Sequence, residues 1–193
     1  MSVLEPIRVL VIPGLEDSGP THWQSWLQSQ FRRSVRVRQR DWAVPDLEAW
    51  SARIGATLAS RPGGRWIAVA HSFGCLALAH HLAQRAAQGQ PAGTGIRGAL
   101  FVAPADPLRF GIDHAVPRER LDVSSRMLAS ESDPWMRSEA ARGWVTAWGS
   151  RFINLGDVGH INAEAGFGPL PLAKSLVAEM MRRLAGEPSS RST

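Results

Sequence analysis

Short apolar runs alternate along this chain with longer stretches whose apolar residues recur at helical spacing. The apolar runs predict six strands, at residues 7–12, 35–39, 65–70, 96–103, 123–129 and 151–155. The helical spacing predicts five helices, at residues 21–31, 46–60, 73–88, 134–148 and 170–184. Strands separated by helices of about ten or more residues pair in parallel through right-handed crossovers. The chain is therefore expected to be an α/β protein with helices on both faces of its sheet, a three-layer sandwich.

A serine follows the third predicted strand directly. The apolar run that ends at Ala70 leads into His71 and Ser72, and an apolar helix begins immediately afterwards. This order predicts a nucleophile elbow, a turn so tight that the serine hydroxyl projects above the edge of the sheet. Small residues are needed two positions before and after the serine because strand and helix nearly touch there. Gly74 meets this need, and Ala70 stands where glycine is usual, so Ser72 is the candidate nucleophile.

Candidate partners for the serine follow the last two strands. A serine hydroxyl is a weak nucleophile unless a base accepts its proton and a further group orients the base. His160 lies in the loop after the sixth strand and is the expected base, and Asp133, after the fifth, is the favoured acid. Asp157, expected to brace the loop of His160, and Asp106, after the fourth strand, are the alternative acids. His22 could line the same site, but no histidine has metal-ligand spacing, so neither a metal nor a cofactor is expected.

Two backbone amides are expected to stabilise a negatively charged oxygen in this site. One is the amide of Phe73, directly after the candidate nucleophile, and the other lies in the loop after the first strand. Gly14 lets that loop approach closely, so the amide of Leu15 is the second candidate. No Gly-Lys-Ser/Thr sequence follows, and the only lysine is Lys174, so a phosphate-binding loop is not indicated.

Length and composition are those of one ordinary globular domain. The 193 residues, 44% of them hydrophobic, suffice for a substantial core. No apolar run reaches the roughly 20 residues of a membrane span, and no export signal is apparent. The single cysteine, Cys75, cannot form an internal disulfide and agrees with a reducing compartment, so a cytoplasmic location is expected.

The net charge of +5 raises the question of a nucleic-acid partner. The densest basic cluster holds Arg32, Arg33, Arg36, Arg38 and Arg40, of which the last three alternate along the second predicted strand. Charges in this arrangement commonly protect the edge of a sheet, and no aromatic residues are interleaved with them. A solvated edge strand is therefore expected, with neither nucleic acid nor a membrane as a partner.

Taken together, the motifs resemble those of the small serine hydrolases of the α/β-hydrolase superfamily that group with the retinoblastoma-binding hydrolase and the bacterial YdeN-like proteins. The resemblance covers nearly the whole chain. It rests on Ile12-Pro13-Gly14, Thr21-His22-Trp23, Asp41-Trp42, Pro45, Trp50, Ala70-His71-Ser72-Phe73-Gly74-Cys75, Asp133-Pro134 and Gly159-His160-Ile161-Asn162. It implies a catalytic set of Ser72, Asp133 and His160, and a six-stranded sheet in the order 2-1-3-4-5-6 without a large lid. One domain is expected over residues 1–185, followed by a mobile tail at residues 186–193.

The expected reaction is acyl transfer through an acyl-enzyme on Ser72, with small carboxylic esters or activated amides as substrates. Trp23, Trp42 and Trp135 are candidates for the walls of the substrate pocket, although a buried core role is as plausible for each, and residues 104–117 could cover part of the pocket. Fold alone does not dictate function. The alternative is therefore a non-catalytic module that binds a protein partner on a hydrolase scaffold.

Overall fold

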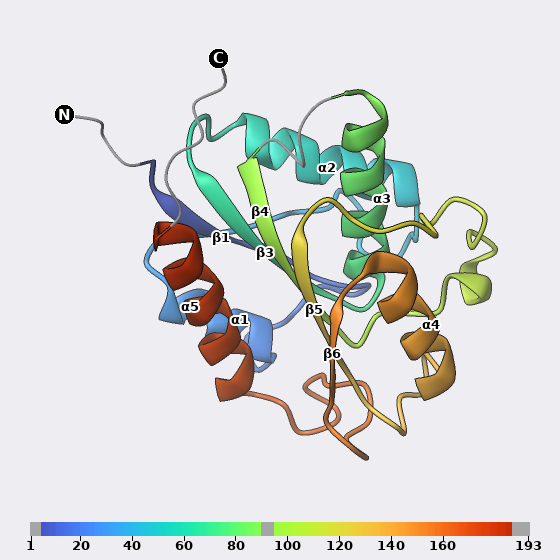
Figure 1. Ribbon diagram of the computed structural model, residues 1–193. Helices are drawn as coiled ribbons and strands as arrows, with labels where there is room; N and C mark the ends of the chain where they lie inside the picture. The colour runs from blue at the N-terminus through green and yellow to red at the C-terminus, as the bar shows by residue number, and fades with distance from the viewer. Residues whose placement is uncertain (1–4, 90–94, 187–193) are drawn as a thin grey trace.

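A computed structural model of the protein describes residues 5–89 and 95–186, and its centre is a six-stranded sheet in which every pair of neighbouring strands is parallel (Figure 1). The strands are β1 (Ile7–Ile12), β2 (Ser34–Arg36), β3 (Arg65–His71), β4 (Ile96–Val102), β5 (Ser124–Ala129) and β6 (Arg151–Asn154). Their spatial order is β2-β1-β3-β4-β5-β6, which confirms the order implied by the family resemblance.

Five α-helices cover the two faces of this sheet. They are α1 (Trp23–Gln30), α2 (Leu47–Ala59), α3 (Phe73–Ala87), α4 (Ser138–Trp148) and α5 (Pro171–Gly186). Helices α1 and α5 lie on one face and α2, α3 and α4 on the other, which confirms the three-layer α/β architecture (Figure 1). At the C-terminal end, helix α5 ends at Gly186. Of the tail expected at residues 186–193, residues 187–193 lie outside the described residues.

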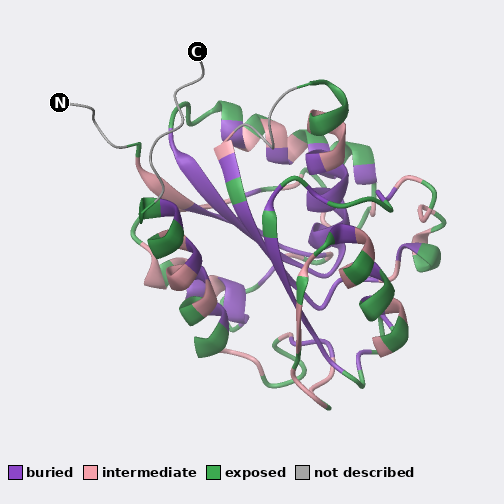
Figure 2. Cartoon of the chain, in the orientation of Figure 1, coloured by how far each residue is buried: buried purple, intermediate pink, exposed green. Residues whose placement is uncertain are grey.

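Alternation along the strands builds a hydrophobic core on each face of the sheet. In β1, Leu10 and Ile12 belong to the core under α2, α3 and α4, whereas Val9 and Val11 belong to the core under α1 and α5. Figure 2 shows the central strands buried and the outward sides of the helices exposed. Because helices cover both faces, every residue of β3 is buried, as is typical of a parallel sheet.

Helix α4 begins later than its apolar pattern predicts. The expected start was residue 134, but the helix begins at Ser138. The backbone before Ser138 forms hydrogen bonds outside the helix. The amide of Trp135 donates to Oδ1 of Asp133 at 2.8 Å, and the carbonyl of Pro134 accepts a hydrogen bond from Arg109. A side-chain oxygen that accepts from the backbone two residues on favours a turn over a helix.

The second strand is shorter than expected, and its arginines differ in environment. Strand β2 ends at Arg36, and Arg38 and Arg40 are exposed. The side chain of Arg36, however, is only 11% exposed and donates to Oδ1 of Asp17 at 2.9 Å and to the carbonyl of Ser18 at 2.7 Å. The predicted edge position of this strand is confirmed, but the expectation that its arginines are solvated is wrong at Arg36, which holds the loop after β1 against the sheet edge.

The connection between β4 and β5, residues 103–123, contains no α-helix. Its only regular element is a 3-10 helix at Pro107–Phe110, and Val116 and Leu121 pack into the core of the α2, α3 and α4 face. Within the described ranges, no helical domain is inserted between consecutive strands. No helix in those ranges is long and apolar enough to cross a membrane.

One buried histidine lies far from the edge where the strands end. His81 of α3 is 4% exposed, and its Nε2 has no hydrogen-bond partner among the described residues. Burial lowers the pKa of His81 from 6.5 to about 4, and the neighbouring Arg85 acts in the same direction. The imidazole is therefore neutral in the folded protein at pH values at which it is protonated in the unfolded chain.

This difference in proton binding predicts that the free energy of unfolding falls as the pH falls from about 6.5 towards 4. Between those values the unfolded chain holds a proton on His81 that the folded protein lacks, so acid favours unfolding. His81→Leu should lower the slope of stability against pH by up to about 1.4 kcal/mol per pH unit. Urea denaturation between pH 5 and 8 measures it. An unchanged slope would contradict the prediction, and His114→Leu, at an exposed histidine, is the control.

Candidate active site

Ser72 occupies a strained turn between β3 and α3. Its φ of 53° and ψ of −125° lie in a region that residues with a side chain rarely adopt. The turn brings the start of α3 so close to β1 that a Cβ on Gly74 would lie 2.7 Å from the carbonyl oxygen of Ile12. Glycine is therefore required at this position. The neighbouring thiol of Cys75 is fully buried, and burial raises its pKa, so it stays protonated at neutral pH.

The structure brings Ser72, His160 and Asp133 together in one chain of hydrogen bonds. Oγ of Ser72 lies 2.9 Å from Nε2 of His160, and Nδ1 of His160 lies 2.9 Å and 3.0 Å from the two carboxylate oxygens of Asp133. The three residues come from the carboxyl ends of β3, β5 and β6, and each is less than one-tenth exposed. This is the arrangement in which a base can take the proton of a serine while a carboxylate holds the base in position.

Hydrogen bonds between the loops after β5 and β6 set the relative position of acid and base. Oγ of Ser130 accepts from the amide of Val158 at 3.1 Å, and Oγ of Ser132 accepts from the amide of Gly159 at 3.1 Å. These two serines precede the acid in sequence, and the two amides belong to the residues just before the base. No motif in the sequence indicates this pairing, because neither serine belongs to a recognisable pattern.

The other carboxylates proposed from the sequence lie elsewhere. Asp106 caps the 3-10 helix by accepting from the amide of Leu108, and Asp157 lines a separate hollow beside the loop after β6. Over residues 5–89 and 95–186, neither carboxylate is hydrogen-bonded to His160, whereas Asp133 is.

The loop after β1 passes directly against the serine. A Cβ on Gly14 would lie 2.7 Å from Cβ of Ser72, so the backbone at this point lies as close as glycine permits. The next residue, Leu15, lines the cavity in front of the serine. Phe73 is the first residue of α3, where the amide has no acceptor within the helix. Both predicted amides thus lie in segments adjoining the serine hydroxyl.

A cavity of about 490 Å³ opens in front of Ser72. Of the three tryptophans proposed for its walls, only Trp135 lines it, beside Phe110 from the connection between β4 and β5. Trp23 is fully buried and donates from Nε1 to the carbonyl of Ile161 at 2.8 Å, and Trp42 packs against another tryptophan of the core. The cavity also has carboxylates in its wall, which the sequence did not indicate: Glu16, Asp17 and Glu164.

Two further histidines line this cavity. His71 lies beside the base, with its Nε2 3.1 Å from the carbonyl oxygen of His160, so it supports the backbone of that loop. Burial lowers the pKa of His71 well below its usual value. The pKa of His22 falls to about 4 because of burial and the nearby guanidinium of Arg36. Both rings are therefore neutral at pH 7. The contact of His71 with the loop of the base joins residues far apart in the chain, so no local sequence pattern indicates it.

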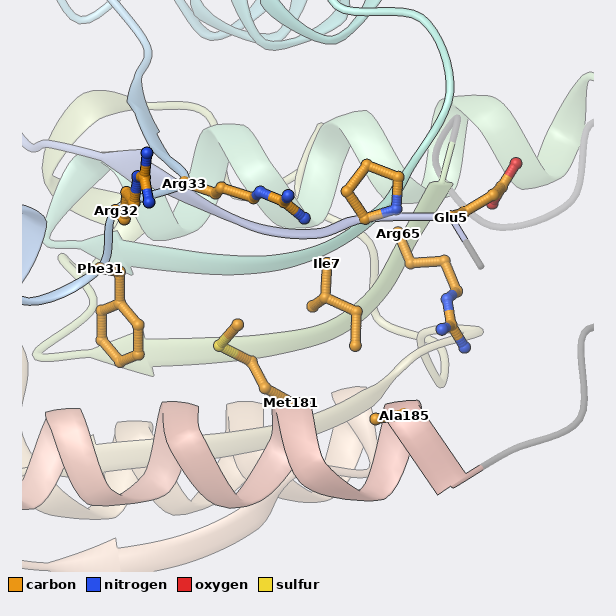
Figure 3. A pocket seen from close by; sticks show the side chains of 9 residues that line it. Glu5, Ile7, Phe31, Arg32, Arg33, Arg65, Met181 and Ala185 are labelled. Atoms are coloured by element: carbon orange, nitrogen blue, oxygen red, sulfur yellow. The ribbon is translucent and has the colours of Figure 1, made fainter. Parts of the chain in front are cut away.

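A larger cavity, of about 580 Å³, lies at the opposite edge of the sheet, where the strands begin. Ile7, Phe31 and Met181 form its apolar wall, and Arg65 contributes a guanidinium group (Figure 3). Its described lining includes no serine, cysteine or histidine, so it holds no counterpart of a serine with a histidine base. The candidate chemistry therefore belongs to the smaller cavity at Ser72.

A family model and solved structures both relate the chain to serine hydrolases and YdeN-like proteins. The serine hydrolase family model matches residues 9–179. A YdeN-like hydrolase from Pectobacterium atrosepticum is 38% identical and aligns over 93% of this chain and 92% of that chain, with a TM-score of 0.85. The ydeN gene product from B. subtilis is 18% identical, covering 91% of this chain and 98% of its own, with a TM-score of 0.73. No curated protein matches the chain.

More distant solved structures share the fold. Est1E from Butyrivibrio proteoclasticus, solved with ferulic acid bound, is 13% identical, with a TM-score of 0.68 over 94% of this chain and 90% of that one. The family match spans most of the chain, and the sheet order is the one that the resemblance implied. The chain therefore belongs to the serine hydrolase family and has the fold of a single α/β-hydrolase domain.

Proposed function

We propose that the protein hydrolyses small carboxylic esters or activated amides through an acyl-enzyme on Ser72. The observation that carries this proposal is the hydrogen-bonded chain in which Oγ of Ser72 lies 2.9 Å from Nε2 of His160, whose Nδ1 lies 2.9 Å from Asp133. A serine with a base within hydrogen-bond reach, and a base oriented by a carboxylate, is the signature of an activated nucleophile. Membership of the serine hydrolase family supports the same chemistry.

In the proposed first half-reaction, Oγ of Ser72 attacks the substrate carbonyl while Nε2 of His160 accepts the hydroxyl proton. Asp133 accepts from Nδ1–H of the imidazole and stabilises the positive charge that the ring acquires. The carbonyl oxygen becomes negatively charged, and the amides of Leu15 and Phe73 are the proposed donors to it. The bond to the leaving alcohol or amine then breaks, and His160 returns the proton to that leaving group.

In the second half-reaction, water takes the place of the leaving group. His160 accepts a proton from the water as its oxygen attacks the acyl carbon, and the same proton returns to Oγ of Ser72 when the acid departs. The net reaction consumes one water and yields a carboxylic acid with an alcohol or amine. None of these steps uses a metal or an organic cofactor.

The size of the cavity favours small substrates. Its volume of about 490 Å³ is in the lower half of the range for small-molecule sites. Two distant structural relatives fit an acyl substrate: Est1E binds ferulic acid, and BorB is a type II thioesterase. We propose a small acyl compound as the partner and, from the single cysteine, a reducing compartment such as the cytoplasm.

A fluorophosphonate reagent should label the protein at Ser72, because such reagents react with serines that a base activates. Ser72→Ala and His160→Ala should both abolish labelling, measured by gel fluorescence and intact mass. Ser125→Ala is the matched control, because Ser125 is also buried but pairs with Ser150 in another part of the sheet. If the folded parent protein remained unlabelled, the hydrolase proposal would fail and a protein-binding module on a hydrolase scaffold would take its place.

Replacing Asp133 by Asn should lower turnover of a short acyl ester by about 10⁴-fold, because the amide no longer holds the imidazole in the productive tautomer. The comparison is Asp106→Asn, which changes a carboxylate that caps the 3-10 helix and should leave turnover unaltered. Steady-state kinetics with a p-nitrophenyl ester measures both. Equal turnover in the two variants would remove Asp133 from the proposed mechanism.

Gly14→Ala should lower kcat by about 10- to 1000-fold, because its Cβ cannot be placed without moving the loop that carries the Leu15 amide away from Ser72. The matched control is Gly143→Ala on α4, where an added Cβ meets nothing within 4 Å. Kinetics and thermal melting are measured together. A Gly14→Ala protein with the kcat of the parent would show that this loop does not contribute to the reaction.

A further inference from the structure

His22 stands at the N-cap position of α1 and in the wall of the Ser72 cavity. Its Nδ1 accepts a hydrogen bond from the amide of Gln24 at 3.1 Å, which caps the helix. The ring is 6% exposed, and its centroid lies 4.9 Å from that of His71, which lies 4.9 Å from that of His160. One nitrogen of His22 is thus committed to the helix while the ring faces the site.

The other nitrogen of His22 is a donor. Burial keeps the imidazole neutral at pH 7, since its pKa is lowered to about 4. Nδ1 accepts from a backbone amide, so the single ring proton lies on Nε2. Among the described residues Nε2 has no acceptor, and the atom is not fully buried. The N–H therefore opens onto the cavity that the ring lines.

Helix capping alone does not account for a histidine at this position. Ser, Asp and Asn are the preferred N-cap residues, and each would accept from the Gln24 amide without placing an aromatic ring in the cavity. The N–H on Nε2 has no acceptor among the described residues, so an oxygen of a ligand that enters the cavity can accept from it without breaking a hydrogen bond within the protein. Both points favour a ligand oxygen as the partner of the second nitrogen.

The charges around the cavity favour an uncharged partner. The wall contains the carboxylates of Glu16, Asp17 and Glu164, and within the part of the chain that the structure describes Asp17 alone of the three forms an ion pair with an arginine. Among its described lining residues there is no lysine or arginine. An anionic ligand would meet repulsion, whereas a neutral oxygen could accept from His22 without it.

We propose that Nε2–H of His22 donates a hydrogen bond to an uncharged oxygen of the ester held at Ser72, an ether, hydroxyl or carbonyl oxygen near the scissile bond. His22 is then a specificity residue. It selects esters with an additional oxygen in the acyl or alcohol part over esters in which both parts are hydrocarbon. The inference rests on the proposed function, since it needs a substrate bound at Ser72. It adds to that function the chemical class of the substrate.

His22→Asn separates the two roles of the residue. The Oδ1 of asparagine can accept from the Gln24 amide as Nδ1 does, so the helix keeps its cap, but the amide nitrogen is bonded to the same carbon as Oδ1 and does not reach the position of Nε2. His22→Ser preserves a cap by a second route and guards against a local effect of asparagine. Circular dichroism and thermal melting establish that each variant is folded, and fluorophosphonate labelling establishes that Ser72 remains activated.

Two pairs of isosteric esters locate the oxygen. The acyl pair is p-nitrophenyl methoxyacetate and p-nitrophenyl butyrate, and the alcohol pair is 2-methoxyethyl acetate and n-butyl acetate. For each pair the ratio of kcat/KM is divided by the ratio of the hydroxide-catalysed rates, which removes intrinsic reactivity. In the parent protein, one of the pairs should show a preference for the oxygen-bearing ester of about 3- to 10-fold. In His22→Asn and His22→Ser this preference should fall to about one, because kcat/KM for the oxygen-bearing ester falls more than kcat/KM for its hydrocarbon isostere.

The outcomes distinguish this inference from the proposed function. A parent protein that hydrolyses the esters without a preference in either pair would overturn the role of His22 and leave the esterase proposal intact. The same conclusion follows if the preference persists in both folded variants, or if both esters of a pair lose activity equally. A parent protein that is neither labelled nor active on any of these esters contradicts the proposed function itself, and the inference with it.

Discussion

The whole site depends on a close approach of backbones at the carboxyl edge of the sheet. The turn at Ser72 places the start of α3 against the end of β1, where only glycine fits at position 74, and the loop after β1 returns against the serine, where glycine is required at position 14. The positive φ of Ser72 is the strain that this geometry carries. It is tolerated because both flanking elements are anchored: β3 is wholly buried between two strands, and α3 packs into the core on one face of the sheet.

Around this turn, buried polar groups are held in definite ionisation and hydrogen-bonding states by their neighbours. Asp133 accepts from a backbone amide and from the base, and the loop of the base is tied to two serines and to His71. His22 and His71 are neutral because burial disfavours the charged ring, and the one N–H of His71 is donated to the carbonyl of His160, so only His22 adds a donor to the cavity, without positive charge. The site thus combines a serine, a histidine beside it and one neutral donor in a wall whose formal charges, among its described lining residues, are carboxylates. This combination suits a neutral ester better than an anion.

The sequence was most informative where one residue type satisfies a local demand. Gly74 and the apolar run before Ser72 indicated the tight turn, and the positions of Asp133 and His160 after successive strands indicated a shared edge. The strand predicted at residues 7–12 and the helix predicted at residues 46–60 depend on equally local signals, and both are confirmed by β1 and α2. The position of a tryptophan in the pocket does not follow from such a local signal. A large apolar ring gives the same sequence pattern whether it faces the core, as Trp23 does, or a cavity, as Trp135 does.

By itself, then, the sequence determined the α/β class and the order of elements along the chain, and it indicated the residues proposed for acyl transfer, because hydrophobic period and turn chemistry act over a few neighbouring residues. Tertiary structure decided which side chains meet. Contacts between distant segments bury Arg36, end β2 early, bring Phe110 into the cavity wall and leave Nε2 of His22 without an acceptor among the described residues. These outcomes depend on contacts between residues far apart in the chain, and no period or motif encodes how two distant segments pack against each other.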